Sequence, residues 1–204
     1  MFMQDFTRIA PFATVFPALP VTTGLAAGTQ VETRSGWRAV ETLRPGDAVQ
    51  TLDGGLARIA AMDRTWLLPA MQGNVLDLGG GAFGNCDKVT LLPDQHLLLD
   101  LDAHDLTGDL PDALGALFPA QALDGHHGIT HRIVRMPLEV VTLMFPEEEL
   151  VWAASGLLLH CPAIRHGAGT APQGDIFPSL PTPAARRLLA ARAAEDDALP
   201  GWYA

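Results

Sequence analysis

Hydrophobic and polar residues alternate along several short stretches of this chain, and the alternation is clearest within residues 24–53. Apolar and polar side chains take turns along residues 30–33, which predicts a strand with one buried face. Ser35 and Gly36 then supply a tight turn, so residues 37–40 are expected to return antiparallel to the first strand. The pattern therefore predicts a β-hairpin near the start of the folded region.

A second turn is predicted in residues 43–47. Pro45 presets φ at the first central position of a type II turn, and Gly46 can take the positive φ that the second position requires. Residues 48–52 alternate again and end at the sequence Asp-Gly-Gly of residues 53–55, which is a further hairpin signal. Turn chemistry and strand periodicity therefore agree along this whole stretch.

Other runs of β-forming residues predict additional strands. They are residues 56–66, 74–78, 88–92, 96–100, 137–145 and 149–153. The last two runs flank a short proline-containing acidic segment, so we expect them to pair with each other as a hairpin. The sequence as a whole predicts a mostly β protein.

Two stretches are instead predicted to be helical. Asp109 as the N-cap, with a proline in the first turn, favours a short helix over residues 110–118. Near the C-terminus, Thr182 precedes Pro183 at the first helical position, which predicts a helix over residues 184–198. We therefore expect one short helical insertion and one C-terminal helix.

Composition narrows the functional classes. With 204 residues, of which 48% are hydrophobic, the chain is long enough to bury one core, and we expect one domain with tails. No apolar run approaches the roughly 20 residues of a membrane-spanning helix. The formal net charge of −10 disfavours attraction to phosphate backbones and anionic membranes. We therefore expect neither nucleic acid nor membrane as a partner.

The two cysteines, Cys86 and Cys161, are too few for a disulfide framework and fit a reducing cytosol, although a single bridge between them stays open. The N-terminal residues lack the basic and long apolar regions of a secretory signal peptide. We therefore expect a cytoplasmic protein, and secretion without a signal peptide stays open.

Three motifs follow one another near the N-terminus: GT at residues 28–29, GWRAVETL at residues 36–43 and RPGD at residues 44–47. Together they resemble the opening of a Hint domain, the autoprocessing module of hedgehog proteins and inteins. More narrowly, the chain resembles the stand-alone bacterial Hint proteins. The resemblance implies an all-β Hint fold with pseudo-twofold hairpins, here with one short helical insertion and a C-terminal helix.

This interpretation divides the chain into three parts. Residues 1–20 contain prolines and no sustained period, and are expected to be an N-terminal arm. Residues 21–162 would form the Hint-like domain. Residues 163–204 would form a segment rich in proline and glycine, followed by the helical tail.

The resemblance can be tested at the position of the nucleophile. A working Hint domain needs a thiol or hydroxyl at its first residue, because its reaction begins with an acyl shift onto that side chain. Alignment on the Gly-Thr pair places Gly24 there, a residue without a side chain. Thr23 precedes it, but a threonine is a weak nucleophile unless a base is placed beside it.

The family's second motif is Thr/Ser-x-x-His, in which the histidine helps to activate the amide. The matching segment places Leu92 at the hydroxyl position and Gln95 at the histidine position. His96 comes one residue later, and a shift of one residue reverses the face of a strand, so we expect a half-exposed strand histidine. The family has another histidine on a later strand, and the corresponding position in this chain is Leu143. The resemblance therefore implies a relic site at Gly24, Leu92, Gln95 and Leu143.

Two further histidine groups have alternative interpretations. His160 and Cys161 are neighbours on a predicted strand and should face opposite sides, so we expect one buried cysteine and one exposed histidine. His126, His127 and His131 lie in one loop and are candidate metal ligands. No Cys-x-x-Cys or His-Glu-x-x-His spacing accompanies them, so no metal is expected.

We therefore expect a Hint domain-containing protein without autoprocessing activity and without a cofactor. It would act as a structural module or as a binding module for an unidentified protein partner. Two alternatives stay open. One is a self-cleaving module of non-standard chemistry that uses Thr23, His96 or Cys161, and the other is a metal-binding protein that uses the three loop histidines.

Overall fold

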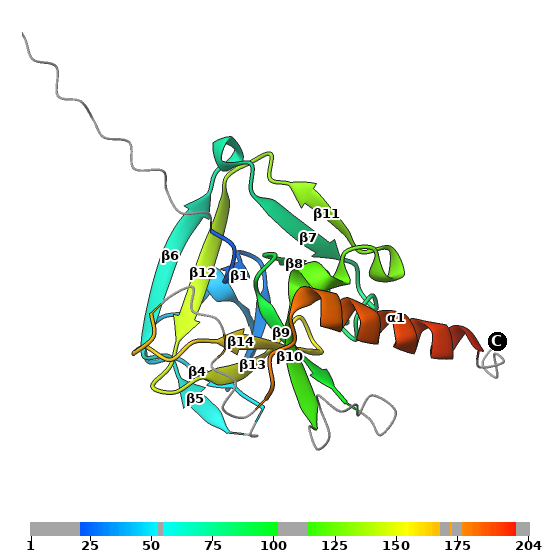
Figure 1. The fold of residues 1–204 in the computed structure, drawn as a ribbon. Helices are drawn as coiled ribbons and strands as arrows, with labels where there is room; N and C mark the ends of the chain where they lie inside the picture. The colour runs from blue at the N-terminus through cyan, green and yellow to red at the C-terminus, as the bar shows by residue number, and fades with distance from the viewer. Residues whose placement is uncertain (1–20, 53–54, 102–113, 168–171, 173–176, 199–204) are drawn as a thin grey trace, which may run out of the picture.

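Two antiparallel β-sheets and one C-terminal α-helix form the part of the protein that the computed structural model describes (Figure 1). The described residues are 21–52, 55–101, 114–167, 172 and 177–198. Within them, no helix is long and apolar enough to cross a membrane.

The first sheet has six strands in the order β11-β7-β8-β1-β12-β6. Its strands are β1 (Leu25–Ala26), β6 (Ala61–Leu67), β7 (Asn74–Leu78), β8 (Val89–Leu91), β11 (Thr130–Ile133) and β12 (Leu138–Met144). Strands β6 and β12 run side by side along their whole length (Figure 1). The short strand β1 lies in the middle of the sheet, because Leu25 pairs with Val141 on one side and Leu91 on the other.

The second sheet has eight strands, in the order β10-β9-β14-β13-β2-β4-β5, with β3 paired to β2 outside this path. Its strands are β2 (Gln30–Thr33), β3 (Gly36–Ala39), β4 (Ala48–Gln50), β5 (Leu56–Arg58), β9 (His96–Asp100), β10 (Gly115–Pro119), β13 (Glu149–Ala153) and β14 (Leu157–Cys161). The 3-10 helices are η1 (Val40–Thr42), η2 (Pro69–Met71), η3 (Ala120–Leu123) and η4 (His126–Gly128).

Helix α1 (Thr182–Ala198) follows the sheets and confirms the predicted C-terminal helix. Its residues Ala185 and Leu189 are buried in the same hydrophobic cluster as Phe118 of β10 and Leu123 of η3. The main core therefore extends from both sheets to one face of this helix.

Both turns predicted near the N-terminus are confirmed. Strands β2 and β3 pair as a hairpin, and Gly36 has a φ of +98°. In the second turn Gly46 has a φ of +92°, and the amide of Asp47 donates to the carbonyl oxygen of Arg44 at 3.0 Å. The backbone conformations that the sequence predicted at these two turns are therefore the ones that the structure has.

The helix predicted over residues 110–118 is wrong for its described part. Residues 115–118 belong to strand β10, all five of whose residues are buried, and residues 110–113 lie outside the described residues. Strand β10 pairs with β9 on one side, and on the other Leu117 exchanges backbone hydrogen bonds with Pro178 and Leu180. Pairing on both sides and burial therefore override the local helix signal.

The predicted pairing of residues 137–145 with residues 149–153 is also wrong. Strand β12 lies in the first sheet between β1 and β6, whereas β13 lies in the second sheet between β14 and β2. The segment between these two strands carries the chain from one sheet to the other. The backbone of Phe145 forms its hydrogen bonds with Pro162 and Ile164 instead. The sequence gives strand and turn signals here but no information about which sheet each strand joins.

The long strand predicted over residues 56–66 is interrupted in the same way. It splits into β5 and β6 at Ile59 and Ala60. The amide of Ile59 donates to the carbonyl oxygen of Asp47, which precedes β4 of the second sheet, and the amide of Ala60 donates to that of Met144 in β12 of the first sheet. The chain therefore changes sheets within what reads as one continuous β-segment.

Candidate functional site

Gly24 lies immediately before β1 at the centre of the first sheet. Its φ of +115° is a backbone conformation that side chains rarely adopt. A Cβ atom at this position would lie 2.6 Å from Cγ1 of Val140 and 3.1 Å from Oγ1 of Thr142, both on β12. The position therefore lacks a nucleophilic side chain and also has no room for one in the present packing.

Gln95 holds the backbone at Gly24 through its side-chain amide, which is buried. Its Oε1 accepts hydrogen bonds from the amide of Gly24 at 3.0 Å and from the hydroxyl of Thr23 at 3.4 Å. Its Nε2 donates to the carbonyl oxygens of His160 at 2.9 Å and His96 at 3.1 Å. Because a glutamine amide has two donors and two acceptor positions, these four bonds use all of them.

The space around this hydrogen-bond network is nearly filled. A cavity of about 10 Å³ remains, lined among others by Gly24, Gln95, Leu143 and Cys161. This volume is close to the lower limit for holding a single water molecule. Three of the four positions of the implied relic site therefore meet in one closed space. The fourth, Leu92, is buried in a separate hydrophobic cluster.

His96 and Thr23 line a neighbouring cavity of about 530 Å³, together with Asp94 and Gln121. The Nδ1 atom of His96 lies 2.9 Å from the carbonyl oxygen of Asp94. Burial lowers the pKa of His96, although the hydrogen bond to the backbone of Asp94 and the charge of its carboxylate oppose this. His96 therefore faces a different space from the one that surrounds Gly24.

The predicted exposure of His160 is wrong, because His160 is only 6% exposed and Cys161 beside it is also buried. All five residues of strand β14 are buried, and because their side chains alternate between the two faces of the second sheet, both faces of the strand are covered. Burial raises the pKa of the Cys161 thiol, and the nearby charge of Glu149 raises it further. Both Cys161 and the exposed Cys86 are free thiols.

His160 faces Glu148, with 3.5 Å between its Nε2 and Oε2 of the carboxylate. This Nε2 is buried and has no hydrogen-bond partner among the described residues. Burial lowers the pKa of His160 to about 4, and the charge of His96 lowers it further. The charge of Glu148 acts in the opposite direction but does not outweigh the effect of burial. His160 is therefore neutral in the folded protein near neutral pH.

We expect acid to destabilise the fold through His160. In the unfolded chain its pKa is about 6.5, so the unfolded state binds the proton first as the pH falls. Stability is then lost between about pH 6.5 and pH 4, by up to about 3 kcal/mol. Urea unfolding across this range should show a smaller pH dependence in His160→Gln than in the wild type. The matched control is His131→Gln, an exposed site. Equal slopes in wild type and His160→Gln would contradict the assignment.

The three loop histidines have different neighbours. The rings of His126 and His127 contact each other edge to face, with centroids 4.2 Å apart. The Nδ1 atom of His131 instead lies 3.0 Å from Oδ2 of Asp124. Within the described ranges, no three or more histidine, cysteine, aspartate or glutamate side chains form a group that could hold a metal ion.

The residues that enclose Gly24 most closely were not found from the sequence. Val140 and Thr142 supply the wall that excludes a side chain, and the main-chain oxygen of His160 anchors Gln95. Each lies more than 60 residues away from its partner in the sequence. No local pattern could have revealed them, because a sheet contact leaves no signal in the sequence next to either residue.

One family model matches more than half of the chain. Residues 23–158 match the Hint domain, whereas no curated protein matches the chain. One similar solved structure is a bacterial intein-like domain from Clostridium thermocellum, with 16% identity over 69% of this chain and 99% of that domain and a TM-score of 0.49. Another is a splice-inactive variant of the AceL NrdHF class 3 split intein, with 15% identity over 69% of this chain and 97% of that one and a TM-score of 0.41. A third is the MchDnaB-1 intein, with 17% identity over 66% of this chain and 98% of that one and a TM-score of 0.37.

Proposed function

The chain belongs to the Hint domain family, and from this premise we propose that it is a Hint domain without autoprocessing activity, which acts as a structural or binding module. The fold is retained in such a protein because the sheets and turns depend on packing, whereas the reaction depends on a few side chains.

The observation that carries this proposal is the environment of the Gly24 amide. An acyl shift at this peptide bond needs a hydroxyl or thiol on residue 24, close to the carbonyl carbon of Thr23. Gly24 has neither group, and Val140 occupies the place that a Cβ would take. Its amide donates to Oε1 of Gln95, a neutral group that does not act as the general acid needed by a leaving nitrogen.

The alternative nucleophiles near this amide are poorly activated. The hydroxyl of Thr23 donates to the same neutral oxygen of Gln95, which does not act as a base. The thiol of Cys161 is held protonated by burial, and the thiolate is the reactive form of cysteine. These contacts support a site that holds the backbone in place without breaking it.

A structural role for Gln95 supports the same proposal. Its four hydrogen bonds connect the chain entering β1 of the first sheet with the start of β9 and with β14, both of which belong to the second sheet. A fully satisfied buried polar group of this kind fixes a unique arrangement of the elements around it. The site thus acts as a cross-link between the two sheets.

We expect the purified full-length protein, fused to a reporter before residue 1, to keep its intact mass during incubation with dithiothreitol or hydroxylamine. Both reagents would release the reporter if a thioester or ester formed at Gly24. Gln95→His restores an imidazole at this position and serves as the matched variant. It should also stay intact because residue 24 still lacks a nucleophile.

A thiol-dependent fragment beginning at Thr23 or at Gly24 in the wild type would contradict the proposal. In that case Thr23→Ala should abolish a fragment that begins at Thr23, because the Thr23 hydroxyl would attack the carbonyl carbon of residue 22, and Cys161→Ala would test the thiol as the nucleophile for either fragment. Mass spectrometry of the reaction separates these outcomes directly.

A further inference from the structure

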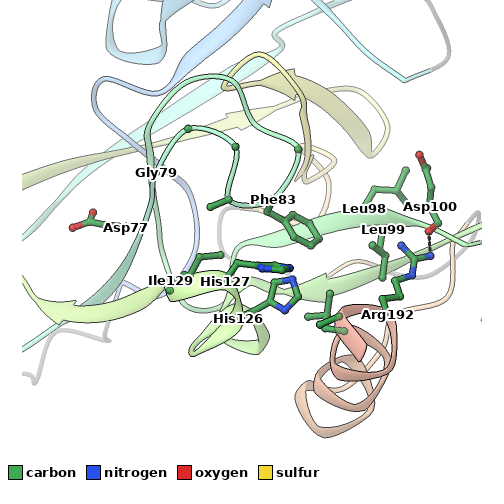
Figure 2. Close-up of a pocket in the computed structure, with 17 residues that line it drawn as sticks. Asp77, Gly79, Phe83, Leu98, Leu99, Asp100, His126, His127, Ile129 and Arg192 are labelled. Atoms are coloured by element: carbon green, nitrogen blue, oxygen red, sulfur yellow. Dashed lines mark hydrogen bonds between the residues drawn. The ribbon is translucent and has the colours of Figure 1, made fainter. Parts of the chain in front are cut away.

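A cavity of about 850 Å³ lies between residues 79–84, η4, strand β9 and helix α1 (Figure 2). This volume lies within the range of small-molecule binding sites in proteins. Among the described residues, none lines both this cavity and the closed space around Gly24. We refer to it as the α1 cavity, and it is independent of the site that carries the proposed function.

One side of the α1 cavity is apolar. Leu99, Ile129 and Leu189 line it and are at least nine-tenths buried. The ring of Phe83 also lines it, and its position is fixed by edge-to-face contacts with Phe118 and His126, at centroid distances of 5.7 and 6.1 Å. This surface suits the hydrocarbon part of a ligand, since apolar and aromatic side chains form most of the lining in small-molecule sites.

The nitrogen-bearing groups of the lining come from η4 and α1. Figure 2 shows the rings of His126 and His127 beside the ring of Phe83, and the guanidinium of Arg192 reaching from α1 towards Asp100. Arg192 donates to the main-chain carbonyl oxygen of Asp100, which fixes its position. An arginine keeps its positive charge at all ordinary pH values and presents a planar set of donors that matches a carboxylate.

His127 has an unusual backbone conformation. Its φ of +44° and ψ of +38° are left-handed, which is uncommon for a residue other than glycine, and glycines stand nearby at Gly125 and Gly128. This conformation places two consecutive imidazoles against each other on the same cavity. The His127 side chain is therefore one of the groups that a ligand in the cavity would meet.

The glycine-rich wall of the cavity is held in place by Asn85, which is buried. Its Oδ1 accepts from the amide of Phe83 at 2.9 Å, and its Nδ2 donates to the carbonyl oxygens of Gly79 and Asp87, each at 2.8 Å. The wall is therefore formed before any ligand arrives. A preformed site loses less conformational entropy on binding.

Two carboxylates lie at the edges of the α1 cavity. The carboxylate of Asp77 accepts hydrogen bonds from Arg132 and Thr90. Burial by itself would raise the pKa of Asp77, but these hydrogen bonds and the charges of Arg132 and Lys88 outweigh it, so the pKa is lowered. Figure 2 shows its carboxylate turned away from the two imidazoles. The charge of Asp77 is therefore balanced outside the cavity by Arg132, while Asp100 contributes its main-chain oxygen to the bond with Arg192.

We propose that the α1 cavity binds a small organic carboxylate with an apolar body. The body would pack against Phe83, Leu99 and Leu189, and the carboxylate would accept hydrogen bonds from Arg192 and His127. Charge-assisted bonds of this kind are about twice as strong as those between neutral groups.

Phenylacetate is the probe for this proposal, and phenylacetamide is its neutral counterpart of the same shape. We expect NMR titration of the full-length protein to show phenylacetate shifting the amide signals of Phe83, His127 and Arg192. Its affinity should exceed that of phenylacetamide by about tenfold, the difference that one charge-assisted contact makes. Equal affinities, shifts confined to other residues, or no shifts at all would overturn the proposal.

Variants assign the two polar partners. Arg192→Gln should lower phenylacetate affinity about tenfold and leave phenylacetamide binding unchanged. His127→Asn keeps a residue that tolerates the left-handed backbone, so the melting temperature should be unchanged or higher while the affinity falls. The control His131→Asn should bind as the wild type does. A lower melting temperature with unchanged affinity in His127→Asn would assign His127 a structural role only and overturn its part in binding.

Discussion

Replacing Gly24 with cysteine is expected to destabilise the fold by about 3 kcal/mol and to leave the protein unable to cleave itself. The new residue would have to adopt a φ of +115°, and its Cβ would lie 2.6 Å from Cγ1 of Val140. Backbone strain costs about 1–3 kcal/mol, and overpacking costs a further 1–3 kcal/mol or so. The measurements are urea unfolding and the intact mass in the presence of a thiol.

Gly28→Cys is the matched control, because Gly28 also has a positive φ of +92° but nothing lies within 4 Å of its Cβ position. It should cost less than Gly24→Cys, and the difference between the two measures the collision with β12. Val140→Ala should recover part of the loss when combined with Gly24→Cys. A Gly24→Cys variant as stable as the wild type, or one with thiol-dependent cleavage, would show that the site can still accept a nucleophile.

Replacing Gly156 with alanine is expected to be more damaging still, with a loss of about 4 kcal/mol or more. Gly156 ends the turn between β13 and β14 with a φ of +155°, and an added Cβ would lie 2.1 Å from the carbonyl oxygen of Gly84. This neighbour is backbone, so no change of rotamer can relieve the collision. The turn and the loop that forms the wall of the α1 cavity would have to separate.

Urea unfolding measures this loss, and the NMR signals of residues 79–84 report where the structure changes. Gly81→Ala is the control in the same loop, with a positive φ of +84° and nothing within 4 Å. It should cost only about 1 kcal/mol. If Gly156→Ala costs no more than Gly81→Ala, the close approach between the turn and Gly84 is not a feature of the folded protein.

Local structure was predictable where the backbone conformation depends only on the residues of a short segment. The turns at Ser35–Gly36 and Pro45–Gly46 were readable because positive φ and proline geometry are properties of two to four consecutive residues. Strand β7 also has the bounds that its run of β-forming residues predicted, Asn74–Leu78. The strand at residues 115–118 was misread because a cap signal before it favoured a helix, while its burial comes from segments distant in sequence.

The candidate site was predictable only in part. Alignment with the family placed Gly24, Gln95 and Leu143 at related positions, and the structure brings these three to one closed space. It places Leu92 in another cluster. The α1 cavity had no sequence signature, because its lining combines a glycine-rich loop, a histidine pair and a helix that are far apart along the chain.

The sequence by itself determined that Gly24 offers no nucleophile, that tight turns occur at Gly36 and Gly46, and that the chain resembles the Hint family. None of these depends on distant contacts. Only the tertiary structure decided that β12 and β13 join different sheets, that His160 is buried, and that Val140 closes the space beside Gly24. The physical reason is that turn preferences act within a few residues, whereas strand partners and burial are set by packing between segments far apart in the chain.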